Sequence, residues 1–119
     1  MLNTERSFPD CPIRDVLSRV CSKWSLLVLV TLDSAAHPLR YKALQEAIPD
    51  MSQKVLSSTL HILQADGLVE REAFAEVPPR VEYRLTPRGR SLMPHVRSLL
   101  QWATENFNDI ICDRSREMM

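Results

Sequence analysis

The segment 52–66 carries a face of hydroxyl, amide and basic side chains that contains no carboxylate. When successive residues are placed about 100° apart, as in an α-helix, this face spans an arc of roughly 140°. Its members are Gln53, Lys54, Ser57, Ser58, His61, Gln64 and Ala65. Mostly apolar residues fill the opposite side, and no aspartate or glutamate lies between Ser52 and Ala65. A surface next to the phosphates of a nucleic acid requires such an absence of negative charge.

The side chains on this face can bond to base edges as well as to phosphates. Glutamine can bond adenine through two hydrogen bonds, Lys54 can reach guanine or a phosphate, and serine and histidine can bond either bases or backbone oxygens. The alternative is an ordinary solvated helix face, but such a surface would more often carry glutamate. We therefore predict a DNA-contacting set that comprises Ser52, Gln53, Lys54, Ser57, Ser58 and His61.

A second candidate contact is the segment 68–85, which holds three arginines. Arg80 directly follows two prolines at the tip of an expected hairpin, while Arg71 and Arg84 lie along its strands. An arginine at such a tip can enter a minor groove. We predict DNA contacts for Arg80 and Arg84. The alternative for all three arginines is pairing with nearby glutamates. Those glutamates are Glu70, Glu72, Glu76 and Glu82.

Hydrophobic periodicity predicts the helices that position these residues. Apolar residues recur at helical spacing from Pro12 to Val20, and residues 24–32 are apolar almost all round, as in a buried helix. A short amphipathic helix follows and must end before Pro49. Ser52 is a good N-cap and Gly67 a good C-terminal residue for the helix that carries the polar face.

After Gly67 the sequence pattern changes from helix to strand. Residues 68–75 and 81–85 predict a β-hairpin, and Thr86-Pro87 caps a long final helix. The predicted class is mainly α with a small β-hairpin (α+β). It is a winged helix-turn-helix of four helices, a two-stranded wing and a long C-terminal helical segment. In this architecture the second helix of the turn enters the major groove of DNA.

Length and composition fit one domain of 119 residues with no net charge. Attraction to DNA must therefore come from an uneven distribution of charge. We expect a flexible N-terminal arm at 1–10, the winged domain at 11–111 and a C-terminal tail at 112–119. The N-terminus lacks a secretory signal pattern and the longest apolar stretch is too short to span a bilayer, so a cytoplasmic location without membrane contact is expected.

The final helix carries an apolar stripe within an arc of roughly 120° and about 30 Å long. A domain of this size cannot easily cover such a stripe, so we predict a homodimer through helices at about 11–21 and 87–111. The alternative for part of the stripe is packing inside the protomer. The predicted dimerisation residues are Leu92, Val96, Leu99, Leu100, Ala103 and Phe107.

Cys11 is the candidate for redox sensing. It lies at the start of the first helix, where free amide groups and the helix dipole favour a thiolate. The alternative is an inert cysteine at a helix cap. The cysteines and histidines are not spaced as metal ligands, so no metal or cofactor is predicted. With only two glycines and no phosphate-binding loop, the sequence does not indicate an enzyme.

The remaining functional alternative is a winged-helix module that binds another protein instead of DNA. Small hydroxyl and amide residues at 53–58 argue against it, because the centres of protein interfaces favour aromatic side chains.

Several blocks of the chain, in order from about residue 11 to 102, resemble the HxlR-type bacterial regulators. They are Cys11-Pro12, Lys23-Trp24, Ile48-Pro49, Ser52-Gln53-Lys54-Val55-Leu56, Asp66-Gly67-Leu68-Val69-Glu70-Arg71, Glu76-Val77-Pro78-Pro79-Arg80-Val81-Glu82-Tyr83 and Leu85-Thr86-Pro87. One departure is Cys21-Ser22, where the family more often has two glycines.

The resemblance implies a transcriptional regulator that binds a roughly palindromic double-stranded DNA operator as a homodimer. It further implies that the helix at 52–66 reads bases and that residues 77–80 form the wing. Some similar proteins use a cysteine at the place of Cys11 as a switch, through a disulfide between subunits or through an adduct. A small-molecule effector or an oxidant is accordingly a further expected partner.

Overall fold

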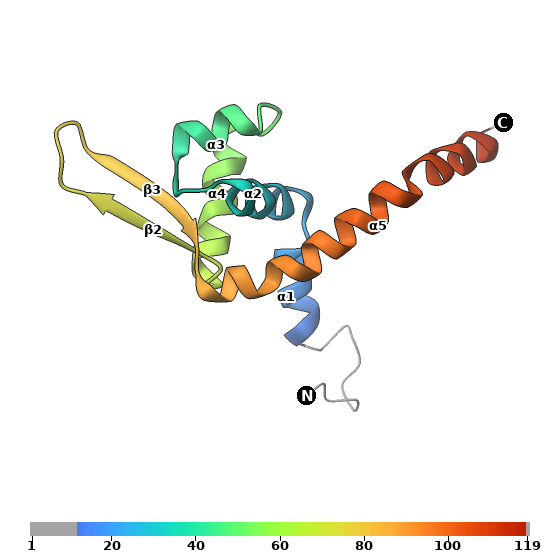
Figure 1. Cartoon of the computed structure of the whole chain (residues 1–119), viewed down its shortest axis with the longest axis horizontal. Helices are drawn as coiled ribbons and strands as arrows, with labels where there is room; N and C mark the ends of the chain where they lie inside the picture. The colour runs from blue at the N-terminus through green and yellow to red at the C-terminus, as the bar shows by residue number, and fades with distance from the viewer. Residues whose placement is uncertain (1–11, 119) are drawn as a thin grey trace.

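The computed structural model describes residues 12–118 and contains five helices and three strands (Figure 1). In chain order these elements are α1 (Pro12–Val20), α2 (Lys23–Ser34), β1 (Leu39–Arg40), α3 (Tyr41–Ala47), α4 (Gln53–Ala65), β2 (Val69–Phe74), β3 (Arg80–Leu85) and α5 (Pro87–Glu117). The predicted class, a mainly α winged helix-turn-helix with a long C-terminal helix, is confirmed. Cys11 lies outside the described residues.

Local chemistry fixes the ends of the two helices that matter most for the site. The Ser52 hydroxyl accepts a hydrogen bond from the Val55 amide at 3.1 Å and caps α4. Gly67 follows α4 with a φ of 74°, a conformation that favours glycine. The Thr86 hydroxyl accepts from the Gly89 amide at 3.0 Å and caps α5.

The wing belongs to a three-stranded antiparallel sheet in the order β1-β3-β2. Strands β2 and β3 pair in the register Val69↔Leu85 through Phe74↔Arg80. The short β1 adds to the other edge of β3, with Leu39 opposite Tyr83. The sequence pattern indicated only the two-stranded wing, because a two-residue strand is too short to show an alternation of apolar and polar residues.

The core lies where α2 meets the helix-turn-helix, the sheet and the start of α5. Helix α2 contacts α1, α3, α4, α5 and β3, and Val28 and Leu29 within it are completely buried. The prediction that this helix lies between other elements is therefore confirmed, although Leu27 on its outer side is 37% exposed. Leu44 of α3, Leu56 of α4 and Met93 of α5 complete the same core.

The end of α4, the base of the wing and the start of α5 meet at one junction. The Thr86 amide donates to the Leu68 carbonyl at 3.0 Å, and the Thr86 hydroxyl donates to the Gly67 carbonyl at 2.6 Å. Arg88 Nη1 donates to the carbonyl of Asp66 at 3.1 Å. Gly89 lies so close to the main chain of Leu68 that a Cβ added at Gly89 would be 2.2 Å from the Leu68 carbonyl oxygen.

Helix α5 extends away from the body of the protein after its first turns (Figure 1). It continues to Glu117, through residues 112–117 that we assigned to the C-terminal tail. The structure corrects one predicted dimerisation residue, because Val96 is only 5% exposed and packs in the core of its own protomer. Leu92 is partly buried against the same core, whereas Leu99, Leu100, Ala103 and Phe107 are exposed.

Candidate nucleic-acid interface

Helix α4 presents the polar face predicted from the sequence to solvent. All six predicted α4 contacts are exposed, and they are Ser52, Gln53, Lys54, Ser57, Ser58 and His61. On the opposite side, Leu56, Thr59, Leu60 and Leu63 are buried in the core. This buried side holds the exposed face rigidly on the protein, which is what a helix that reads a groove requires.

Tyr41, at the start of α3, connects the two helices of the helix-turn-helix. Its hydroxyl donates to the main-chain carbonyl of Gln53 at 2.9 Å and lies 2.9 Å from the Ser57 hydroxyl. The sequence pattern predicted a short amphipathic helix here and assigned no role to Tyr41. Its partners lie twelve and sixteen positions further along the chain, so no local pattern could reveal this contact.

Arg84 on β3 is engaged by two glutamates of the neighbouring strand. Its Nε donates to Glu70 at 2.6 Å and its Nη1 donates to Glu72 at 2.9 Å. The hydrogen bond and charge of Glu70, together with those of Glu72, raise the pKa of Arg84 above its usual value. The strand register places Glu70 directly opposite Arg84. In the protein without DNA, Arg84 is therefore paired with glutamates, which is the alternative considered from the sequence.

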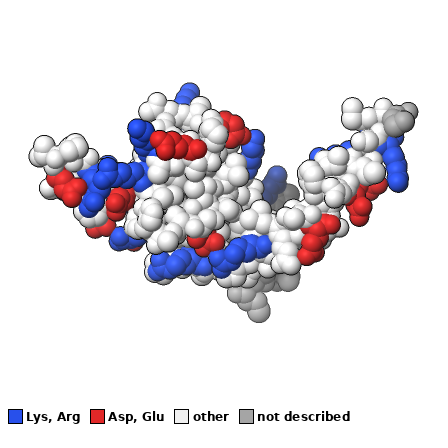
Figure 2. Space-filling view, turned by 45° about the horizontal axis from the view of Figure 1, so that its top comes forward, with Lys and Arg blue, Asp and Glu red and all other residues white. Residues whose placement is uncertain are grey.

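Arg80 is held more loosely at the far end of the wing. Its guanidinium lies over the Phe74 ring, with 4.1 Å between the Cζ and the ring centroid. Its Nε lies 3.4 Å from Glu76 and 3.6 Å from Glu82, and among the described residues it has no acceptor in hydrogen-bond geometry. Figure 2 shows basic and acidic side chains side by side along the wing, so the wing is not a purely basic surface.

Helix α1 is attached to the C-terminal end of α4 by an ion pair that sequence analysis also missed. The Arg19 Nε donates to both carboxylate oxygens of Asp66, at 2.9 and 3.1 Å. The hydrogen bond that Arg19 donates to Asp66 is the main cause that raises the pKa of Arg19. The Arg19 carbonyl in turn accepts from the Ser25 hydroxyl at 2.8 Å, which connects α1 to α2.

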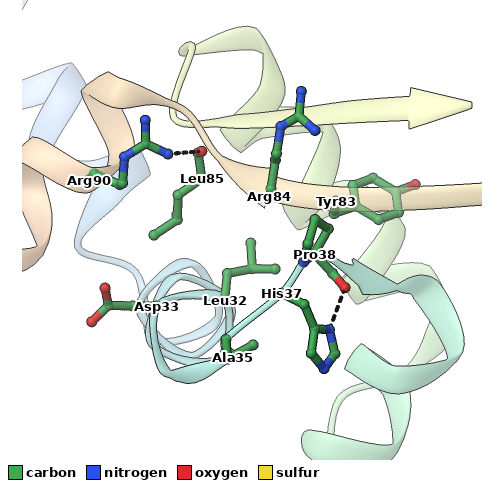
Figure 3. A pocket seen from close by; sticks show the side chains of 10 residues that line it. Leu32, Asp33, Ala35, His37, Pro38, Tyr83, Arg84, Leu85 and Arg90 are labelled. Atoms are coloured by element: carbon green, nitrogen blue, oxygen red, sulfur yellow. Dashed lines mark hydrogen bonds between the residues drawn. The ribbon is translucent and has the colours of Figure 1, made fainter.

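A pocket of about 260 Å³ lies between the end of α2, β3 and the start of α5 (Figure 3). Its polar side chains are bonded to the protein itself. Asp33 pairs with Arg97 at 2.6 Å, Arg90 donates to the Leu85 carbonyl at 3.0 Å, and His37 Nδ1 donates to the Pro38 carbonyl at 2.9 Å. These hydrogen bonds hold the polar side chains of the pocket in place.

Within residues 12–118, no group of three or more histidine, cysteine or carboxylate side chains could hold a metal ion. Cys21 and Cys112 are free and exposed. In the same part of the chain, none of the helices combines the length and hydrophobicity needed to cross a bilayer.

A helix-turn-helix with an exposed second helix, followed by a β-hairpin, defines the class of winged helix-turn-helix transcriptional regulators. Within that class, the HxlR-like helix-turn-helix family matches residues 19–110. The chain belongs to this family, as its sequence blocks predicted. It is a transcriptional regulator of the winged helix-turn-helix type, and its family is one of regulators rather than of enzymes.

Individual proteins support the assignment. The HTH-type transcriptional regulator YtfH of Escherichia coli is 38% identical over 88% of this chain and 82% of its own. The structure of the transcriptional regulator ytfH from Salmonella typhimurium superposes with a TM-score of 0.81 at 34% identity, over 95% of this chain and 97% of that one. The redox regulator HypR in its reduced form has a TM-score of 0.77 at 30% identity, over 86% and 99%.

Proposed function

We propose that the protein binds a roughly palindromic DNA operator as a homodimer, with α4 of each subunit in a major groove. The observation that carries this proposal is the face of α4, which is exposed from Gln53 to His61, free of carboxylates and backed by buried leucines. Lys54 lies in the first turn of α4, where the positive end of the helix dipole adds to its charge. Both effects favour approach to the phosphates on either side of the groove.

The wing supplies a second contact in this proposal, and Arg80 is its main residue. Its guanidinium is loosely paired and stacked on Phe74, so it can exchange the glutamates for a phosphate or a minor groove without breaking a strong hydrogen bond. Arg84 would have to give up two short hydrogen bonds to do the same.

Exposed apolar residues on α1 and α5 support the homodimer. Val16 and Leu17 of α1 are exposed, as are Leu99 and Phe107 of α5 at 52% and 59%. Burying such side chains on a second copy removes them from water and creates a two-fold symmetric pair of α4 helices. A two-fold pair matches a palindrome whose half-sites lie about one DNA turn apart.

The test is DNA binding as a function of salt. A labelled duplex from the region upstream of the protein's own gene is titrated by fluorescence anisotropy between about 50 and 200 mM salt. We expect a steep loss of affinity, and Lys54→Ala should reduce the slope of log affinity against log salt by about one. Arg114→Ala, near the distant end of α5, is the matched control and should keep the wild-type slope. An unchanged slope in Lys54→Ala would contradict the proposed role of α4.

We also propose that oxidation of Cys11 changes the dimer geometry and thereby the affinity for the operator. The similarity to HypR, for which both reduced and oxidised forms are known, supports a redox response. Wild type, Cys11→Ser and the control Cys21→Ser are treated with diamide before the same binding assay. Only Cys11→Ser should lose the response to diamide, and a response that persists in this variant would rule out Cys11 as the sensor.

A further inference from the structure

Tyr41 fixes the direction in which the Ser57 hydroxyl can hydrogen-bond. A tyrosine hydroxyl has a single proton, and a main-chain carbonyl can only accept. The 2.9 Å contact with the Gln53 carbonyl therefore uses the proton of Tyr41. The second contact of the same hydroxyl, 2.9 Å from the Ser57 hydroxyl, must then be donated by Ser57.

Ser57 thus faces outward as an acceptor only. An isolated serine hydroxyl can both donate and accept, which makes it a poor discriminator between bases. Here its one proton points back to Tyr41, and the lone pairs that remain are directed away from that bond. The side chain is exposed on the face of α4 that the proposed function brings into the major groove.

We propose that Tyr41 is a positioning residue that makes Ser57 specific for an exocyclic amine in the major groove. The donors on that edge are the N6 amine of adenine and the N4 amine of cytosine, whereas guanine and thymine present only acceptors. Phosphate oxygens also only accept, so Ser57 cannot serve as a phosphate contact. Every base pair has one such amine, which lies on one strand or the other. At a given position of one strand, Ser57 therefore favours adenine or cytosine over guanine or thymine.

Ser52, the N-cap of α4, and Ser58 within α4 have different hydrogen-bonding roles. Ser52 uses its oxygen to accept from the Val55 amide, so its own proton stays available for a phosphate or for a base acceptor. Ser58 has no hydrogen-bond partner among the described residues and keeps both roles. Ser58→Ala is therefore the matched control for Ser57→Ala, since both remove one exposed hydroxyl from the same turn.

The inference rests on the proposed function, so the experiment begins with that function. Wild type, Ser57→Ala, Ser58→Ala and Tyr41→Phe are each used to select binding sites from a random duplex library. The base pair faced by Ser57 is the one whose preference disappears in Ser57→Ala and persists in Ser58→Ala. We expect Tyr41→Phe to accept thymine or guanine there, because the freed Ser57 proton can donate to O4 or O6.

A direct measurement then removes the amine from the DNA. At that position adenine is replaced by purine, or cytosine by 2-pyrimidinone, and affinity is measured for each protein on the same duplexes. Removal of the amine should reduce the affinity of wild type about threefold to tenfold more than it reduces the affinity of Ser57→Ala. The loss measured with Ser57→Ala accounts for the weaker base pair. In a Ser57→Ala background, adding Tyr41→Phe should cause no further change in base preference.

The outcomes separate the two proposals. If wild type selects no sequence and Lys54→Ala leaves its salt dependence unchanged, the proposed function fails and the inference fails with it. If wild type selects a sequence but Tyr41→Phe keeps the wild-type base preference, or removal of the amine costs wild type no more than it costs Ser57→Ala, only the inference is overturned. Thermal unfolding of each variant confirms that it is folded.

Discussion

Arg80 and Arg84 lie on the same strand, yet their surroundings predict that only the substitution of Arg80 weakens DNA binding. Arg84 forms two short hydrogen bonds to Glu70 and Glu72, whereas Arg80 has ion pairs of 3.4 and 3.6 Å and a stacking contact with Phe74. A phosphate can replace the weak partners of Arg80 at little cost. We therefore expect Arg80→Ala to weaken binding and Arg84→Ala to leave the number of phosphate contacts unchanged.

The size of the effect follows from counterion release. One phosphate contact contributes about −0.9 to the slope of log affinity against log salt, so a fourfold rise in salt weakens it about 3.5-fold. Between about 50 and 200 mM salt, Arg80→Ala should lose about 3.5-fold less affinity than wild type, and Arg84→Ala should follow wild type. The assay is fluorescence anisotropy on the operator duplex. Equal slopes for the two variants, or a smaller slope for Arg84→Ala alone, would refute this reasoning.

Two further predictions concern assembly and stability. Phe107→Asp should dissociate the proposed dimer in sedimentation velocity because it places a charge on the exposed apolar stripe of α5, whereas Ser98→Asp, about 180° around the same helix, should not. A dimeric Phe107→Asp would exclude this stripe as the interface. Gly89→Ala should lower the free energy of unfolding by about 3 kcal/mol or more, since its Cβ would meet the Leu68 oxygen at 2.2 Å. Gly67→Ala should lower the free energy of unfolding by a smaller amount, about 1–2 kcal/mol, because of its positive φ. Denaturant titration measures both losses, and a larger loss for Gly67→Ala than for Gly89→Ala would show that the contact at Gly89 relaxes freely.

The sequence predicted the elements whose signals are local. The hydroxyl caps at Ser52 and Thr86 and the glycine at Gly67 act within a few residues of their own position, and the structure confirms all three. The polar and apolar sides of α4 also follow directly from helical periodicity. The exposed face of the candidate site could therefore be predicted from the sequence.

Features that depend on tertiary contacts could not be predicted in this way. Strand β1 exists because its two residues meet the edge of β3, and Tyr41 reaches Ser57 only once α3 and α4 have packed. Periodicity placed Val96 on the same apolar stripe as Phe107. It does not indicate which turns of the stripe pack on the core of the same protomer. Here the packing of α5 on the core buries Val96 and leaves Phe107 exposed.

The junction around Thr86 has a consequence for how a signal can reach DNA. Main-chain and side-chain hydrogen bonds fasten the first turn of α5 to both Gly67 and Leu68, and Gly89 leaves no free space against that loop. These contacts connect α4, the wing and the first turn of α5 to one another within the protomer. In the homodimer that we propose, a change in the angle or spacing between the two subunits would therefore move α4 and the wing of each subunit together.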